Sequence, residues 1–336
     1  MITYLQAIVL GLLQGVTELF PISSLGHSVL VPALIGGSWQ DLVTQSDTAS
    51  SEGSPYLAFI VALHVATALA LLVFFRADWV RIIRGFFRTL RPSWAARRIM
   101  ARDGDERLAW LLVIGTIPVG ITGLALEHLF RTLFAKPLAA AVFLTLNGLI
   151  LLAGEWLRRK APADDEQVAD APVHPAAPVD PTATMPISAY RGDPPAPSAA
   201  GVPARERGRR RLTTLSYREA GIIGLFQTFA LLAGISRSGI AMVGGLARGL
   251  SHRDAAHFSF LLATPVILAA GVLKLPSLAG PAGAHIHGQA VAGFLSAGLA
   301  AYVSVKWLTR WFETRTLIPF AIYCLVAGVF CIAWFA

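Results

Sequence analysis

The sequence has few charged residues and almost no cysteine. Asp, Glu, Lys and Arg make up 14% of its 336 residues, against 55% hydrophobic residues, which argues against an ordinary water-soluble domain. Its two cysteines, Cys324 and Cys331, lie seven residues apart in one apolar run. That spacing suits neither a metal site nor a disulfide between neighbours, so we expect packing residues. The start, Met1 to Tyr4, carries no side-chain charge, and we expect no removable signal peptide.

Apolar runs of the length needed to cross a bilayer core, about 20 residues, recur along the chain. The sequence therefore predicts an all-α polytopic membrane protein. Two further apolar stretches, residues 2–30 and 219–247, are interrupted by glycines and, in the first, by Pro21. Each favours a re-entrant helix hairpin over a straight span. The predicted spans cover residues 56–75, 108–126, 137–154, 256–273, 289–306 and 317–335.

One long stretch lacks the apolar residues that folding requires. Residues 161–204 hold 10 of the 20 prolines, and a basic run follows them. This composition predicts a disordered linker over residues 161–211. The linker separates a first membrane repeat, residues 1–160, from a second, residues 212–336, and each repeat contains one hairpin and three spans.

Positive charge is distributed unevenly between the predicted spans. The loops at 76–107, 155–218, 248–255 and 306–316 fall on one side and carry 9, 10, 2 and 3 of the 28 Lys and Arg residues. The positive-inside rule makes this side cytoplasmic, which explains the net charge of +8 without a nucleic-acid partner. Both termini then lie outside. The odd number of spans in each half inverts the second repeat relative to the first, which is a recurring architecture with its site at the repeat interface.

The polar residues of the two hairpins form an internal repeat. Residues Gln14 to His27 read QGVTELFPISSLGH, and residues Gln227 to Gly239 read QTFALLAGISRSG. A shift of 213 residues aligns them without a gap. Because ionisable groups at membrane depth are costly and usually functional, we interpret the two stretches as two halves of one site.

Arg237 in the second stretch is the candidate anion ligand. A buried guanidinium needs an anionic partner, and its planar fork fits phosphate or carboxylate oxygens. The neighbouring Ser236 and Ser238 can donate hydroxyl hydrogens, and Gly234 and Gly239 allow backbone amides to approach closely. A helix starting here would add the field of its amino end. These residues together predict a phosphate cradle.

The first stretch carries the candidate reacting groups. Glu18 lies four residues after Gln14, so both face one side of a helix. Glu18 could act as general acid or base, or bind a hard divalent cation together with Gln14. Ser24 is the candidate hydroxyl nucleophile, three residues from His27, which could itself be a base, a nucleophile or a leaving-group acid. Ser23 is expected to bind phosphate, because its repeat partner lies in the cradle.

Structural alternatives remain open for these residues. Glu18 and Arg237 can form an ion pair that has no chemical role, and a histidine on an apolar face, such as His27, is usually structural. His64 lies in the predicted span at 56–75, where we expect a hydrogen bond between helices in preference to a place at the site.

Two motifs, residues 14–27 and 234–239, resemble the signature motifs of the bacterial undecaprenyl-diphosphate phosphatase family, also called bacitracin resistance protein. The resemblance continues through residues 107–123 and 251–265 and excludes only the insert at 161–211. It implies an enzyme of the bacterial inner membrane that removes the terminal phosphate of undecaprenyl diphosphate, using Mg²⁺ or Ca²⁺, at a site that opens outward. The product is the lipid carrier of peptidoglycan synthesis.

The resemblance implies catalytic roles for Glu18, Ser24, His27 and Arg237. The chain departs from the family pattern where Glu, Thr, Pro and Thr are common, and the lost carboxylate and hydroxyls would remove metal or phosphate contacts. The departures are Gln14, Leu25, Ala233 and Ala241.

A polyprenyl-phosphate flippase that binds the head group at the same site is the second hypothesis, because inverted repeats can rock to give alternating access. The set of Glu, His, Ser and Arg exceeds what head-group binding requires, which favours the enzyme. The expected partners are the polyprenyl diphosphate and membrane lipids. The sequence leaves the oligomeric state open, with a homodimer as one option.

Overall fold

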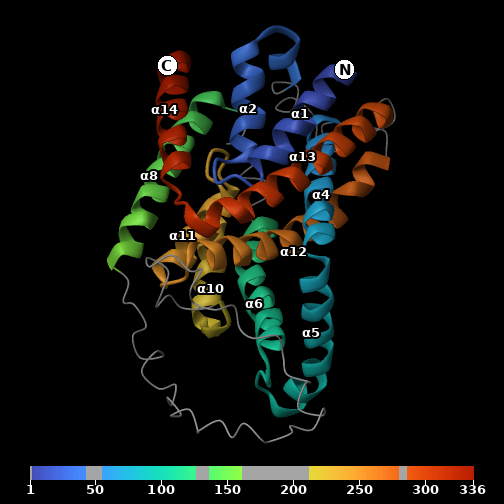
Figure 1. Ribbon diagram of the computed structural model, residues 1–336. Helices are drawn as coiled ribbons and strands as arrows, with labels where there is room; N and C mark the ends of the chain where they lie inside the picture. Colours follow the sequence, from blue (N-terminus) through green and yellow to red (C-terminus); the bar gives the residue numbers. More distant parts are fainter. Residues whose placement is uncertain (1, 43–54, 126–135, 161–211, 280–285) are drawn as a thin grey trace, which may run out of the picture.

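The computed structural model describes residues 2–42, 55–125, 136–160, 212–279 and 286–336 (Figure 1). These ranges are helical, and no β-strand forms within them. The helices are α1 (Tyr4–Thr17), α2 (Ser24–Ile35), α4 (Pro55–Phe74), α5 (Arg76–Ala96), α6 (Gly104–Ala125), α8 (Pro137–Lys160), α10 (Tyr217–Phe226), α11 (Arg237–Ala247), α12 (His252–Ala279), α13 (His287–Thr314) and α14 (Ile318–Phe335), with 3-10 turns η1 (Gly37–Trp39), η4 (Leu212–Thr214) and η5 (Gln227–Leu231).

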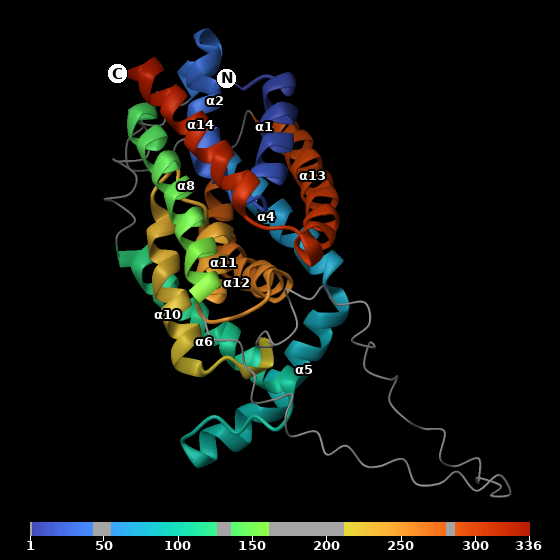
Figure 2. The same ribbon diagram turned by 60° about the vertical axis from the view of Figure 1, so that its left-hand side comes forward.

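The long apolar helices confirm a polytopic membrane protein. Within the described ranges, α6, α8, α12, α13 and α14 are long and apolar enough to cross a membrane. The bent pair of α4 and α5 supplies a sixth candidate. Each predicted span therefore coincides with a helix, and both ends of the chain lie at the same end of the molecule (Figures 1 and 2).

The local structure of the two hairpins repeats at the predicted shift of 213 residues. Helix α1 begins with a capping box between Thr3 and Gln6, and α10 begins with a capping box between Ser216 and Glu219. The second helix of each hairpin, α2 or α11, also begins with a serine whose hydroxyl accepts from the amide three residues later. These caps satisfy backbone donors that a helix leaves unpaired at its start, so the repeated sequence produces repeated helix starts.

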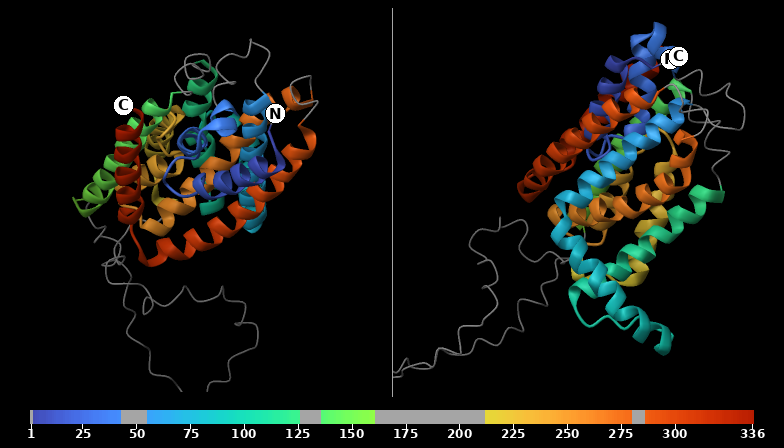
Figure 3. Two further views of the ribbon diagram at one scale, coloured as in Figure 1. Left: turned by 90° about the horizontal axis from the view of Figure 1, so that it is seen from above. Right: turned by 90° about the vertical axis from the view of Figure 1, so that its right-hand side faces the viewer.

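The two halves of the chain pack by exchanging helices. Helix α1 of the first half lies along α13 of the second, and α10 of the second half lies along α6 of the first. Between these exchanged pairs, α4 contacts α12 and α8 contacts α14. The view in Figure 3 (left) shows elements of both halves surrounding the two hairpins. The two hairpins therefore meet inside the molecule, and helices of both halves are needed to enclose them.

Several predicted boundaries were wrong. Helix α13 continues to Thr314 through most of the predicted loop at 306–316, and α8 continues to Lys160, beyond the predicted end of its span at 154. Residues 76–107 were expected to form a loop, but α5 occupies Arg76–Ala96. Its many arginines obscure a helical spacing of buried residues, which begins at Ile82 and ends at Ser93. The first hairpin was expected to end at residue 30, but α2 continues to Ile35 through Pro32. The predicted linker at 161–211 lies outside the described residues. Cys324 and Cys331 are buried and unpaired, as expected for packing residues.

Candidate functional site

The tips of the two hairpins touch through Ser23 and two glycines. The Ser23 hydroxyl accepts from the amide of Gly26 at 3.2 Å and from the amide of Gly234 at 3.1 Å. A Cβ on Gly26 would lie 2.9 Å from the Cα of Gly234, and Gly234 adopts φ 111°. Only glycine combines this backbone conformation with so close an approach. The contact joins residues 211 positions apart.

Asn147 of α8 joins the same two tips from a third helix. Its Nδ2 donates to the carbonyl of Pro21 at 3.0 Å, and its Oδ1 accepts from the amide of Ser236 at 3.0 Å. The side chain is fully buried, so both hydrogen bonds replace contacts with water that are not available there. Asn147 therefore fixes the position of one hairpin relative to the other.

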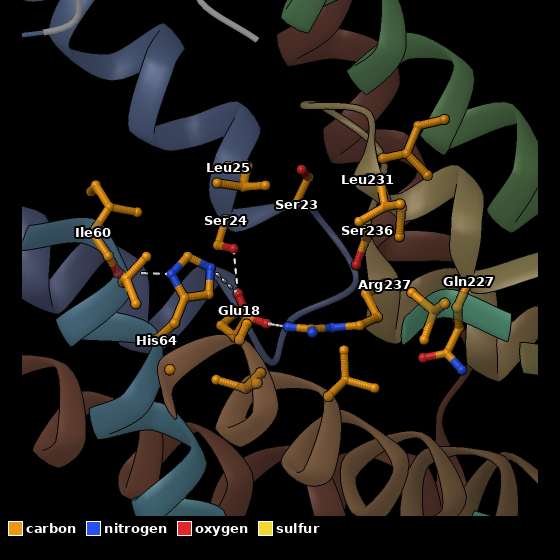
Figure 4. A pocket seen from close by; sticks show the side chains of 18 residues that line it. Glu18, Ser23, Ser24, Leu25, Ile60, His64, Gln227, Leu231, Ser236 and Arg237 are labelled. Carbon is orange, nitrogen blue, oxygen red and sulfur yellow. Dashed lines mark hydrogen bonds and ion pairs between the residues drawn. The ribbon is translucent and has the colours of Figure 1, made fainter. Parts of the chain in front are cut away.

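Glu18 is the centre of the polar cluster (Figure 4). Its carboxylate forms an ion pair with Arg237 and accepts a hydrogen bond from the hydroxyl of Ser24. Gln14 Nε2 donates to Oε2 at 3.1 Å, and His64 Nε2 lies 3.3 Å from the same oxygen. The Glu18 side chain is only 5% exposed. A buried carboxylate needs this many partners because its charge has lost its water.

The cluster borders a cavity of about 210 Å³. Polar groups of both hairpins face it, and the rest of its wall is apolar. Arg237 is the first residue of α11 and Ser24 the first of α2, so the amino ends of two helices point at this space. Amino ends of helices favour anions. The polar residues of the lining are Glu18, Ser23, Ser24, His64, Gln227, Ser236 and Arg237.

Several predicted site residues do not line this cavity. His27 contacts the carbonyl of Ser23 through Nδ1 at 2.6 Å and the hydroxyl of Tyr323 through Nε2 at 2.8 Å. Because a carbonyl only accepts, Nδ1 carries the hydrogen and Nε2 accepts from Tyr323. Ser238 lies within 3.0 Å of the Ser236 hydroxyl and 3.4 Å of the Phe20 carbonyl.

Three further predicted residues, Gly234, Gly239 and Gln14, also lie outside the cavity lining. Gly234 and Gly239 donate their amides to Ser23 and Ser236 and stay outside the cavity lining. Gln14 is fully buried behind Glu18.

Sequence reasoning missed two residues at or beside the site and ranked a place at the site second for a third, His64. His64 touches the Glu18 carboxylate, although a bond to another helix was expected to explain it. Its Nδ1 lies 2.8 Å from the carbonyl of Ile60, so each ring nitrogen lies beside an acceptor. Asn147 and Tyr323 were missed. The available signal was a polar side chain in an apolar span, and it was weak because Thr145 lies in the same span as Asn147.

Glu18 and Gln14 are the residues that the sequence predicts to hold a divalent cation. Gln14 Oε1 is buried and has no hydrogen-bond partner in the described ranges. Within those ranges, no three His, Cys, Asp or Glu side chains gather closely enough to hold a metal ion. Mg²⁺ commonly binds one or two carboxylates and completes its coordination with phosphate oxygens and water. Glu18 borders the cavity, whereas the free amide oxygen of Gln14 is buried outside the cavity lining. One carboxylate at the cavity is consistent with that arrangement.

Comparison with known proteins places this site in a family context. The chain is 63% identical over 355 residues to a protein of Frankia alni named undecaprenyl-diphosphatase 2, with 100% of this chain and 98% of the relative covered. It is 56% identical over 336 residues to the undecaprenyl-diphosphatase of Mycolicibacterium paratuberculosis, with coverage of 100% and 98%. A Burkholderia lata protein named undecaprenyl-diphosphatase 2 is 38% identical, with coverage of 97% and 95%.

The family comparison covers both hairpins. Residues 7–177 and 196–330 match the bacitracin resistance protein BacA family. The match therefore includes Glu18, Ser24 and Arg237, which meet at the cavity. On this match and on the identities above, the chain belongs to the bacitracin resistance protein BacA family.

Proposed function

We propose that this membrane protein is a phosphatase that hydrolyses undecaprenyl diphosphate to undecaprenyl phosphate and phosphate, and so recycles the lipid carrier of peptidoglycan synthesis. One observation carries the proposal: the Ser24 hydroxyl and the Arg237 guanidinium converge on the Glu18 carboxylate beside an apolar cavity. The relatives named undecaprenyl-diphosphatase support the same substrate. Transport of the lipid head group, the alternative function, needs no hydroxyl held against a carboxylate.

The phosphate-binding part of the site comes mainly from the second hairpin. Arg237 and Ser236 face the cavity, and the amino end of α11 starts there. A diphosphate entering the cavity would take over the Arg237 guanidinium, whose planar fork matches two phosphate oxygens. Ser23 reaches the same space from the first hairpin. Fixed positive groups of this kind stabilise the charge that develops on a transferring phosphoryl group.

The reacting part comes from the first hairpin. Ser24 donates its hydroxyl hydrogen to Glu18, so its oxygen can attack the terminal phosphorus while Glu18 takes the proton. The bond from that phosphorus to the bridging oxygen breaks, and undecaprenyl phosphate leaves with the proton from Glu18. A water then attacks the phosphoserine, Glu18 accepts its proton, and the Ser24 oxygen recovers a proton as phosphate leaves.

Two histidines would support this chemistry in different ways. His64 orients the carboxylate of Glu18, and its other ring nitrogen is held by the carbonyl of Ile60. His27 holds the carbonyl of Ser23 and is itself held by Tyr323. The geometry therefore favours a positioning role for His27 in place of the direct catalytic role expected from the sequence.

A divalent cation, Mg²⁺ or Ca²⁺, would be held at the cavity by Glu18 together with the substrate, and the free amide oxygen of Gln14 lies behind that carboxylate. It would neutralise charge on the phosphate oxygens. We propose that this cation takes part in catalysis, and removal of the metal with a chelator tests that role.

The proposed arrangement in the membrane is an inverted repeat. The matched hairpins and the exchange of α1 and α10 between halves support it. In this proposal the two hairpins are re-entrant, and the first enters from outside and the second from the cytoplasm. The termini and the opening of the site face outward, and residues 161–211 lie in the cytoplasm.

Phosphate release from undecaprenyl diphosphate by the purified protein in detergent tests the function. We expect release in Mg²⁺, loss of release with a chelator, and loss of release in Arg237→Ala. Arg310→Ala, which removes an exposed arginine of α13, is the matched control and should retain full activity. A well-folded wild type that releases no phosphate would refute the proposal.

A further inference from the structure

Helix α5 has three distinct faces. Residues Ile82, Gly85, Thr89 and Ser93 form its buried face. Successive residues of an α-helix are about 100° apart around its axis. This spacing places a second set of side chains on a different face of α5. They are apolar but exposed: Val80, Ile83, Phe87, Leu90 and Trp94. A third stripe is basic and exposed: Arg81, Arg84, Arg88 and Arg91. An exposed apolar stripe beside a basic one is the pattern of a helix that lies in a membrane interface.

The direction of α5 fits the plane of a membrane. The chain bends by 87° between α4 and α5. In Figure 3 (right), α4 and α13 run along one diagonal, and α5 runs across that direction at the end of the molecule away from both termini. Since α13 is a candidate span, a helix that runs across its direction at this end lies along the membrane surface. The basic loops predict that this surface is the cytoplasmic one.

Acidic side chains neutralise only part of the basic stripe. Arg81 pairs with Asp78 and with Asp105, and Arg88 pairs with Asp103 and Glu106. Arg84 and Arg91 form no ion pair within the described part of the chain, and the same holds for Arg97 and Arg98 beyond the end of α5. The structure thus leaves four arginines available to an external anion.

A cavity of about 550 Å³ adjoins the free end of α5. Arg97 and Arg98 line it together with two tryptophans, Trp94 and Trp110. Trp94 is 85% exposed, and Trp110 is oriented by its hydrogen bond to the Thr89 hydroxyl at 3.0 Å. Tryptophan beside arginine suits the level of the lipid head groups, where one part of a side chain is apolar and the other wet.

We propose that α5 lies in the head-group layer of the cytoplasmic leaflet and binds anionic phospholipid, with Arg84, Arg91, Arg97 and Arg98 as its phosphate ligands. Charge complementarity selects this occupant. The cytoplasmic leaflet is the anionic surface next to the bent α4–α5 pair, and it can cover the apolar and basic stripes at once. A second copy of this chain would bring the same arginines against one another and is disfavoured by repulsion.

Lipid titration of the full-length protein tests the binding. The protein in dodecyl maltoside is titrated with dioctanoyl phosphatidylglycerol, or with dioctanoyl phosphatidylcholine, and bound lipid is counted by native mass spectrometry. We expect tighter binding of phosphatidylglycerol. Each arginine near an anionic lipid surface contributes about a fivefold change in affinity, so Arg84→Gln/Arg91→Gln and Arg97→Gln/Arg98→Gln should each weaken binding about 25-fold.

The matched control removes two exposed charges from α13, in Lys306→Gln/Arg310→Gln, and should bind like the wild type. Equal affinity of the wild type for both lipids would overturn the proposal, as would an equal loss in the control. Lipid binding needs no phosphatase activity, so the two proposals fail separately.

A second measurement tests the position of α5 when the protein is in a bilayer. The full-length protein is placed in 7:3 phosphatidylcholine–phosphatidylglycerol vesicles that carry bromine near the top of the acyl chains. We expect these lipids to quench the fluorescence contributed by Trp94, taken as the difference between wild type and Trp94→Phe. An unquenched Trp94 contribution, or cross-linking of α5 to α5 of a second copy, would refute the proposal.

Discussion

The two hairpins have the same local fold and different chemistry at equivalent positions. Their second helices begin at Ser24 and at Arg237, which are 213 residues apart. Both side chains reach Glu18, whose own equivalent in the second hairpin is Leu231. One hairpin thus supplies the hydroxyl and the carboxylate, and the other supplies the guanidinium. Two copies of the same helix start can therefore place the reacting groups of a site in one half of the chain and its anion-binding group in the other.

The backbones of the two hairpins differ in the segment before the second helix. The second hairpin has the 3-10 turn η5 and a positive φ at Gly234 there, and the two capping serines also differ. The capping serine of α11, Ser236, has φ −85°, whereas Ser23 has φ 74°. A non-glycine residue in the left-handed region costs about 1 kcal/mol or more. The hydroxyl contacts of Ser23 and the bond from His27 to its carbonyl offset this cost. The strained turn lies in the half that carries the proposed nucleophile.

Removal of the carboxylate should have the largest effect. Glu18→Gln keeps the size of the side chain but cannot accept the Ser24 proton, and we expect phosphate release to fall by about 10³-fold. Assay of undecaprenyl diphosphate hydrolysis with Mg²⁺ measures this. Glu313→Gln, which changes an exposed acid on α13, is the control and should retain activity. Release within tenfold of wild type from Glu18→Gln would exclude Glu18 as the base.

The two serines at the hairpin starts should respond differently. Ser24→Ala removes the proposed nucleophile and should lower kcat by about 10³-fold. Ser236→Ala removes a helix cap and one proposed phosphate contact, so we expect a change of about tenfold, mainly in KM. A search for 32P-labelled phosphoserine after a rapid quench separates the two roles. Equal losses of kcat in both variants would show that the division between halves is wrong.

Much of this arrangement could be predicted from the sequence, for reasons that particular residues show. The apolar lengths predicted every span, and the 213-residue shift predicted the paired helix starts, because capping depends on a few local residues. The partners of His27 and His64 were predicted poorly. Their choice depends on which helix face meets which, and a single apolar span does not reveal that. Asn147 was missed for the same reason. Its importance lies in the two hydrogen bonds by which it joins the loop at Pro21 to the loop at Ser236.

The contact between hairpin tips should be sensitive to a single methyl group. Gly234→Ala would place Cβ 2.4 Å from the Ala140 carbonyl oxygen and keep an unfavourable φ, and we expect a loss of stability of about 3 kcal/mol or more. Gly36→Ala has a similar positive φ, but nothing lies within 4 Å of its Cβ, so the loss should be about 1 kcal/mol. Thermal unfolding in detergent compares them. Equal shifts in Tm would mean that the tips do not touch.

The smallest predicted effect concerns the positioning of the first hairpin alone. Tyr323→Phe removes the hydroxyl that donates to His27 Nε2 but keeps the ring stacked on the imidazole. One hydrogen bond is worth about 1 kcal/mol, or about fivefold, so kcat should fall by that amount while KM stays unchanged. If His27 were instead the reacting base, freeing Nε2 would shift the pH dependence of kcat, whereas a positioning role leaves its shape unchanged. The second hairpin has Ile240 at the equivalent position, so the support that Tyr323 provides belongs only to the half with the strained turn.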